Sequence, residues 1–204
     1  MRSRAGAVLT CRTMGGIAVR FCNEDRGLPD DDLLADWIDR VRERIYASAR
    51  FEGAEPRDYA CTLVACIVRA DAMVTVHVGD GAVVTRDVDG AWECPSWPET
   101  GEYASTTYFV TEDPVPRVRT TRRSDGAPVE IAVLTDGIER LALDYASRMP
   151  HAPFFDGLFG IVRRSEAMGR DVRLSSGLAD FLGGPKFAER TDDDKTLILA
   201  SRAR

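Results

Sequence analysis

The fold is decided by Val129-Glu130-Ile131-Ala132-Val133-Leu134-Thr135-Asp136-Gly137. Its centre, 131–134, is apolar at every position, so a strand here has to be covered on both of its faces. The run stops abruptly at Asp136-Gly137, and the apolar residues that follow recur at helical spacing instead. We therefore predict a buried strand that delivers Asp136 to its end, with a helix after it.

The composition is that of a single soluble domain. The chain has 204 residues, of which 44% are hydrophobic and 29% charged, so we treat 1–204 as one domain with a substantial core. No apolar run approaches the roughly 20 residues that span a bilayer, and Met1-Arg2-Ser3-Arg4 does not open a signal peptide. We expect a cytoplasmic protein with no membrane partner.

Charge and residue types narrow the function further. The net charge of -6 argues against a nucleic-acid partner, which would usually bind a basic surface. The five cysteines form no Cys-x-x-Cys pair, and His77 and His151 are the two histidines, which makes a zinc site improbable and excludes a multi-histidine site. We expect His77 to be packed or hydrogen-bonded. A metal site in this chain should be rich in carboxylates and suit a hard ion.

Apolar spacing predicts the helices, which we place over 5–21, 33–50, 138–146 and 154–162. The second of these has the clearest pattern, because acids stand near its start and arginines in its later turns, where each favours the helix dipole. Residues 174–187 are less regular.

Alternation and short apolar runs predict the strands, which we place over 60–68, 73–78, 82–86, 91–94, 106–110 and 196–200, besides the buried strand that starts at Val129 and ends at Asp136. Gly79-Asp80-Gly81 is too short to be anything but a tight connection, so the strands on either side should be antiparallel neighbours. The arginines clustered over 117–123 favour a solvated loop or edge strand over a phosphopeptide contact.

This order of elements predicts the α+β class, because strands joined by turns favour antiparallel sheets that the helices then cover. Several strands are apolar on both faces. We therefore expect two stacked, mainly antiparallel sheets with helices outside, a four-layer arrangement.

Three acids are candidates for a shared site. If the strand that ends at Asp136 and the strand that starts after Asp193 are antiparallel, these two acids lie at one rim, and Asp80 joins them if its strand points the same way as the one before Asp136. Like charges gathered at one edge are stabilised by a cation. Each acid also has a plainer interpretation: Asp80 as a turn residue, Asp136 as a helix cap, and Asp193 as part of a solvated acidic loop.

Several short motifs, taken together, resemble the metal-dependent serine/threonine protein phosphatases of type 2C, particularly their compact bacterial branch. The matching blocks are Tyr59-Ala60-Cys61-Thr62-Leu63, Val78-Gly79-Asp80-Gly81, Gly101-Glu102-Tyr103-Ala104-Ser105-Thr106-Thr107-Tyr108-Phe109, Leu134-Thr135-Asp136-Gly137 and Asp193-Asp194-Lys195-Thr196-Leu197. They occur in the family's order along nearly the whole chain.

The resemblance implies an αββα sandwich and a metal-dependent reaction. Asp136 and Asp193 would be metal ligands, and Asp80 would bind a more weakly held third metal. In that family two Mg²⁺ or Mn²⁺ ions hold a water or hydroxide that attacks a phosphoserine or phosphothreonine. The implied partner is a phosphoprotein substrate or a regulatory protein.

The sequence also departs from the family pattern. The central Asp-Gly motif, whose acid bridges both metals, is absent, and Ser3, Gly6 and Ala7 look like the residues that follow it. We therefore expect an N-terminally incomplete or start-shifted phosphatase domain, with its N-terminal strands missing. Arg140 stands where many members carry another acid.

Two functions follow as predictions. The first is hydrolysis of phosphoserine and phosphothreonine by a metal-activated water, and the second, favoured by the missing bridging acid, is a catalytically inactive binding or regulatory module. A third class, the hydrolases with an N-terminal nucleophile, would need Ser3 or Cys11 to begin a strand, and both lie in a predicted helix.

Overall fold

Two antiparallel sheets, each with its own helices, carry the fold of the computed structural model, which describes residues 2–99, 107–189, 191 and 193–202. The contacts of the chain divide into two units. Unit 1 comprises Met1–Gly81 and Ser96–Ala127, and unit 2 comprises Ala82–Pro95 and Pro128–Arg204. The chain therefore passes from one unit to the other three times.

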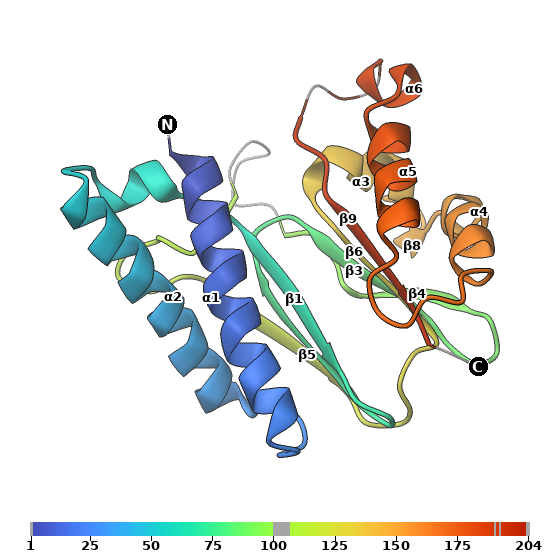
Figure 1. The fold of residues 1–204 in the computed structure, drawn as a ribbon, viewed down its shortest axis with the longest axis horizontal. Helices are drawn as coiled ribbons and strands as arrows, with labels where there is room; N and C mark the ends of the chain where they lie inside the picture. The colour runs from blue at the N-terminus through green and yellow to red at the C-terminus, as the bar shows by residue number, and fades with distance from the viewer. Residues whose placement is uncertain (1, 100–106, 190, 192, 203–204) are drawn as a thin grey trace. The chain divides into compact units, whose positions relative to one another are not determined.

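The helices of unit 1 are α1 (Ser3–Asn23) and α2 (Asp31–Phe51), which lie side by side (Figure 1). The N-cap of α2 is Asp30, whose side chain accepts a hydrogen bond from the Leu33 N–H at 2.8 Å. Residues Asp31 and Asp32 follow in the first turn, where the helix dipole favours acids. Both predicted N-terminal helices are confirmed.

The sheet of unit 1 has the strand order β1-β2-β5, with antiparallel pairing throughout. After the short 3₁₀ helix η1 (Pro56–Tyr59), its strands are β1 (Leu63–Val68), β2 (Met73–Val78) and β5 (Arg119–Arg123). Apolar residues of β1 and β2 join those of both helices in one buried cluster. The edge position of β5 confirms the edge-strand interpretation of the arginine cluster.

The strand predicted over 106–110 is wrong for the residues that the structure describes, because 107–110 form no strand, while Thr106 lies outside the described part. Two separate contacts hold this segment instead. The Val110 N–H donates to the Cys61 carbonyl at 2.9 Å, and the Phe109 N–H donates to Glu112 Oε1 at 3.1 Å.

The sheet of unit 2 has the order β4-β3-β6-β9. Its strands are β3 (Ala82–Arg86), β4 (Trp92–Ser96), β6 (Glu130–Leu134) and β9 (Leu197–Ser201). Strand β6 pairs antiparallel with both β3 and β9, so it is an inner strand of this sheet with hydrogen-bonded neighbours along both edges. The predicted hairpin of β2 and β3 is wrong, because the two strands belong to different sheets and Gly79-Asp80-Gly81 leads the chain from one sheet into the other.

The helices of unit 2 follow β6 along the chain. They are η2 (Asp136–Ile138), α3 (Glu139–Ala142), α4 (Ala152–Val162), α5 (Val172–Leu182) and α6 (Pro185–Ala188). The helix predicted over 138–146 is too long, because β7 (Leu143–Asp144) pairs with β8 (Met149–Pro150) and ends α3. The less regular stretch contains two helices, and Asp171 caps α5 by accepting a hydrogen bond from the Leu174 N–H at 3.0 Å.

Helix α4 packs on one face of this sheet. The ring of Trp92 on β4 lies 5.2 Å from that of Phe155 and 5.4 Å from that of Phe159, measured between ring centroids. Just past α4, Arg163 Nη2 lies 2.7 Å from Glu130 Oε2, and Glu130 is buried on β6. An aromatic contact and an ion pair to the buried Glu130 therefore fix α4 at two places along the sheet.

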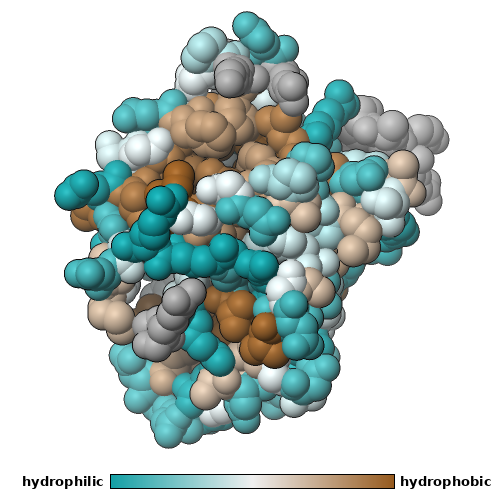
Figure 2. All heavy atoms as spheres, turned by 90° about the vertical axis from the view of Figure 1, so that its right-hand side faces the viewer, coloured by the Kyte–Doolittle hydropathy of each residue, from teal (hydrophilic) through white to brown (hydrophobic). Residues whose placement is uncertain are grey.

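Some large apolar side chains of unit 2 stay exposed around α4 and α5, namely Ile161, Met168, Val172 and Phe181. Figure 2, which views the molecule from this side, shows the apolar (brown) areas broken up by hydrophilic (teal) ones. Within the described residues, no helix combines the length and the apolar character needed to cross a membrane.

The α+β class is confirmed, since each unit combines an antiparallel sheet with helices of its own. Each unit thus supplies one sheet and one helical layer of the predicted sandwich. The stacking of the two sheets on one another stays a prediction.

Candidate metal centre

The rim of the unit 2 sheet brings Asp136 and Asp193 together. In the antiparallel pairing of β6 and β9, Leu134 lies opposite Leu197, so the end of β6 adjoins the start of β9. Asp136 follows β6 and Asp193 precedes β9. Both line one hollow, which we call the rim hollow, together with Gly137, Ile138, Glu139, Arg140, Leu141 and Thr191. The predicted meeting of these two acids is therefore observed.

A threonine hydroxyl joins the two loops that carry the acids. The Thr196 N–H donates to Thr135 Oγ1 at 2.9 Å, and this hydroxyl donates to the Asp194 carbonyl at 3.4 Å. The Thr135 N–H also donates to the Thr196 carbonyl at 3.1 Å. No feature of the sequence pattern marks Thr135, although it adjoins the predicted ligand Asp136.

The acids are also oriented by their own backbones. Asp136 Oδ1 accepts a hydrogen bond from the Gly137 N–H at 2.9 Å, and Asp193 Oδ1 accepts one from the Asp194 N–H at 2.8 Å. Asp136 does not cap a helix, because the N-cap position of η2 is Thr135. A backbone N–H thus orients each carboxylate at the rim, where a nearby cation would relieve the repulsion between them.

The third predicted ligand lies in the other unit. Asp80 is half-buried in the link between β2 and β3. Its neighbour Gly79 takes a φ of 106°, and a Cβ there would lie 2.4 Å from Thr62 Cγ2, so the glycine is required beside the acid. The part of Asp80 in the metal site stays a prediction.

The donors of the rim hollow fit one hard cation. Carboxylate oxygens are the ligands that Mg²⁺ and Mn²⁺ prefer, and Mg²⁺ is usually held by one or two carboxylates with water completing its shell. In the part of the chain that the structure describes, no group of three or more His, Cys, Asp or Glu side chains is placed to hold a metal ion. The described side chains therefore do not by themselves supply the ligand set of a two-ion site.

The sequence model of the family described as Protein phosphatase 2C matches residues 1–183. The chain belongs to the protein phosphatase 2C family. Over 172 residues it is 39% identical to Serine/threonine-protein phosphatase 3 of Escherichia coli (strain K12), a match that covers 84% of this chain and 67% of that protein.

Solved structures share the phosphatase 2C fold with this chain. PppA, a key regulatory component of T6SS in Pseudomonas aeruginosa, matches with a TM-score of 0.56 at 15% identity, over 95% of this chain and 77% of that one. Serine/threonine phosphatase Stp1 from Staphylococcus aureus matches with a TM-score of 0.52 at 14% identity, over 88% and 72%. At such identities the likeness concerns the fold.

A cation accompanies the acids of this phosphatase 2C chain. Arg140, on α3, lines the rim hollow with Asp136 and Asp193, and its side chain is exposed. The rim hollow therefore offers carboxylates for a metal ion and a guanidinium for an anion such as a phosphate group.

His77 of the phosphatase 2C chain is a buried structural group. Its Nδ1 lies 2.7 Å from Ser96 Oγ and 2.9 Å from Arg119 Nη2. Burial, together with the nearby Arg119 guanidinium, lowers the pKa of His77 from 6.5 to about 3. The histidine is thus neutral at pH 7 and hydrogen-bonded, as predicted.

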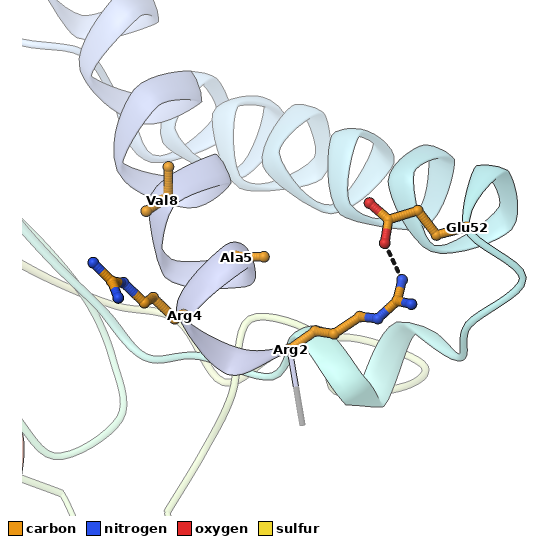
Figure 3. A pocket seen from close by; sticks show the side chains of 5 residues that line it. All are labelled: Arg2, Arg4, Ala5, Val8 and Glu52. Atoms are coloured by element: carbon orange, nitrogen blue, oxygen red, sulfur yellow. Dashed lines mark hydrogen bonds and ion pairs between the residues drawn. The ribbon is translucent and has the colours of Figure 1, made fainter.

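A second hollow lies at the N-terminus of α1 and is lined by Arg2, Arg4, Ala5, Val8 and Glu52. Figure 3 shows Arg2 reaching across to Glu52, with which it forms an ion pair, while Arg4 points away from that pair. Ser3 and Cys11 lie within α1, so neither begins the strand that an N-terminal nucleophile would need.

Proposed function

We propose that this chain hydrolyses phosphoserine and phosphothreonine in proteins, with Asp136 and Asp193 holding a divalent metal ion in the rim hollow. The observation that carries this proposal is the shared lining of that hollow by both acids. A bound Mg²⁺ or Mn²⁺ ion would lower the pKa of a coordinated water and polarise the phosphoryl oxygens. We also propose a cytoplasmic location.

The chain's own residues would bind and orient the reactants. The carboxylates of Asp136 and Asp193 supply the negative charge that attracts the cation, and Asp80 is proposed as a further ligand. The exposed guanidinium of Arg140 would bind the phosphate group of a phosphoprotein, because a planar fork of N–H donors matches phosphate oxygens.

The test is Mn²⁺-dependent hydrolysis of p-nitrophenyl phosphate and of a phosphothreonine peptide by the full chain. We expect Asp136→Asn and Asp193→Asn each to lower kcat/KM by about 100-fold or more, since even residues that only support metal ligands cost 10–100-fold. Asp180→Asn is the matched control, because Asp180 is an exposed acid on α5. Activity that survives either ligand substitution, or removal of metal with EDTA, would refute the assignment.

A second candidate is a phosphoprotein-binding or regulatory module without turnover. The presence of Arg140 among the acids of the rim hollow favours it, because a fixed cation there favours an anionic group and disfavours a second metal ion. Calorimetric binding of the phosphothreonine peptide by a chain that does not hydrolyse it would support this module. Tight binding of two Mn²⁺ ions would count against it.

A further inference from the structure

We propose that Thr135 is a positioning residue that sets the separation of Asp136 and Asp193 and thereby the affinity of the rim hollow for a divalent cation. This inference rests on the proposed function, because it assigns Thr135 a role through the two metal ligands.

The contacts of one hydroxyl carry the inference. Thr135 Oγ1 accepts from the Thr196 N–H at 2.9 Å and donates to the Asp194 carbonyl at 3.4 Å. Asp136 directly follows Thr135, and Asp193 directly precedes Asp194. The hydroxyl therefore ties together the peptide units next to the two acids.

The two loops are also packed as closely as their backbones allow. A Cβ placed on Gly137 would lie 2.4 Å from the Asp194 carbonyl oxygen, a distance that real Cβ contacts do not reach. The hydroxyl of Thr135 thus pulls the loops together, and the bare Cα of Gly137 permits the approach.

Electrostatics explains why this tie should matter for metal binding. Two carboxylates at one hollow repel each other when no cation is bound, so the loops that carry them tend to move apart. A tie that holds them in place keeps the ligands ready for the ion. Without the hydroxyl, the Thr196 N–H and the Asp194 carbonyl lose this partner, and only the backbone bond from the Thr135 N–H to the Thr196 carbonyl still opposes the repulsion at this point.

The test is calorimetric titration of the full chain with Mn²⁺, accompanied by thermal unfolding. Thr135→Val keeps the shape of the side chain and removes the hydroxyl, and we expect its Kd for Mn²⁺ to rise about tenfold, the lower end of the effect of supporting residues. Thr135→Ser restores the hydroxyl and should bind as the wild type does.

Thr85→Val is the matched control. Thr85 is a buried threonine of the same unit whose Oγ1 donates to Glu93 Oε1 at 3.2 Å, away from the rim hollow. It should lower Tm without changing the Kd for Mn²⁺. Two results would overturn this inference and leave the proposed function standing. One is an equal Kd for Mn²⁺ in Thr135→Val and wild type, and the other is a rise in Kd in Thr85→Val as large as that in Thr135→Val. A wild-type chain that binds no Mn²⁺ would overturn the proposed function and the inference together.

Discussion

Gly137 lines the rim hollow at a place with no room for a side chain. Its Cβ position is blocked by the Asp194 carbonyl at 2.4 Å, which is backbone and cannot turn aside as a flexible side chain would. Glycine is therefore needed here for steric reasons, because the loop before β9 occupies the position of a Cβ atom.

Replacing Gly137 with alanine should destabilise the chain by about 1–3 kcal/mol, the usual range for forcing extra atoms into a packed region. Urea unfolding followed by circular dichroism measures this. Gly177→Ala is the control, because Gly177 lies inside α5 with open space around it, and alanine there should stabilise by about 0.5–1 kcal/mol. If the free energy of unfolding changed in the same direction in both variants, steric crowding at Gly137 would not be the explanation.

The sequence could predict that Asp136 and Asp193 lie at one rim, but not that the Thr135 hydroxyl joins the loops that carry them. Asp136 and Asp193 follow from an apolar run that stops at an acid and from a short strand that starts after one. The partners of Thr135 Oγ1 lie 59 and 61 residues further along the chain. They are identified only once the register of β6 and β9 is known, and that register is a tertiary property.

Among the elements, β2 is a strand whose burial changes the acid–base behaviour of one of its residues. All six of its residues are buried, and one of them is His77. A charged imidazole would lose its hydration there, so the strand holds the histidine neutral.

The burial of β2 predicts a loss of stability in acid. The pKa of His77 is about 3 in the folded chain and 6.5 as a model value, so between these pH values the unfolded chain binds the extra proton. Stability is therefore fully present above pH 6.5 and falls as the pH drops, by up to about 1.4 kcal/mol per pH unit. Chemical unfolding at pH 7, 6 and 5 measures the slope.

Two histidine variants distinguish the contribution of His77 to the pH dependence of stability from that of other titrating groups. His77→Gln should flatten the slope between pH 7 and 5, whereas His151→Gln should leave it unchanged, because His151 is exposed. If His77→Gln and wild type lose stability equally over this range, β2 does not hold the histidine in its neutral form.

The sequence predicts whether a segment is a helix or a strand where the apolar pattern is long. It does not predict which strands pair with one another. The stripe of α2 and the apolar run of β6 each identify their element correctly. Gly79-Asp80-Gly81 indicates a tight connection, but a short connection can join two strands of one sheet or lead from one sheet to another. The pairing of β3 with β6 shows that β3 belongs to the sheet of unit 2 and not to that of β2. The helix predicted over 138–146 is too long for a similar reason, because the pairing of β7 with β8 overrides the helical spacing after Ala142.

At the scale of the whole molecule, the two units are interleaved along the chain. Strand β3 and all of β4 except Ser96 come from Ala82–Pro95, a segment between the two parts of unit 1. Strand β6 has β3 on one side and β9 on the other. We therefore propose that residues 1–204 form a single folding domain, although their contacts divide in two.

Cutting the chain after Ala127 tests this proposal. A fragment of 128–204 lacks β3 and β4, so β6 loses its neighbour β3, and Phe155 and Phe159 lose the ring of Trp92. We expect this fragment not to unfold cooperatively by itself. Circular dichroism of each fragment, of their mixture and of the intact chain measures this. Cooperative unfolding of the isolated fragment would show that unit 2 folds independently.

The interleaving also bears on how such a chain can change over generations. Because it crosses between its units three times, a single recombination breakpoint cannot exchange one unit for that of another gene without dividing the other. Any breakpoint that separates Asp80 from Asp136 and Asp193 therefore also divides one of the two units.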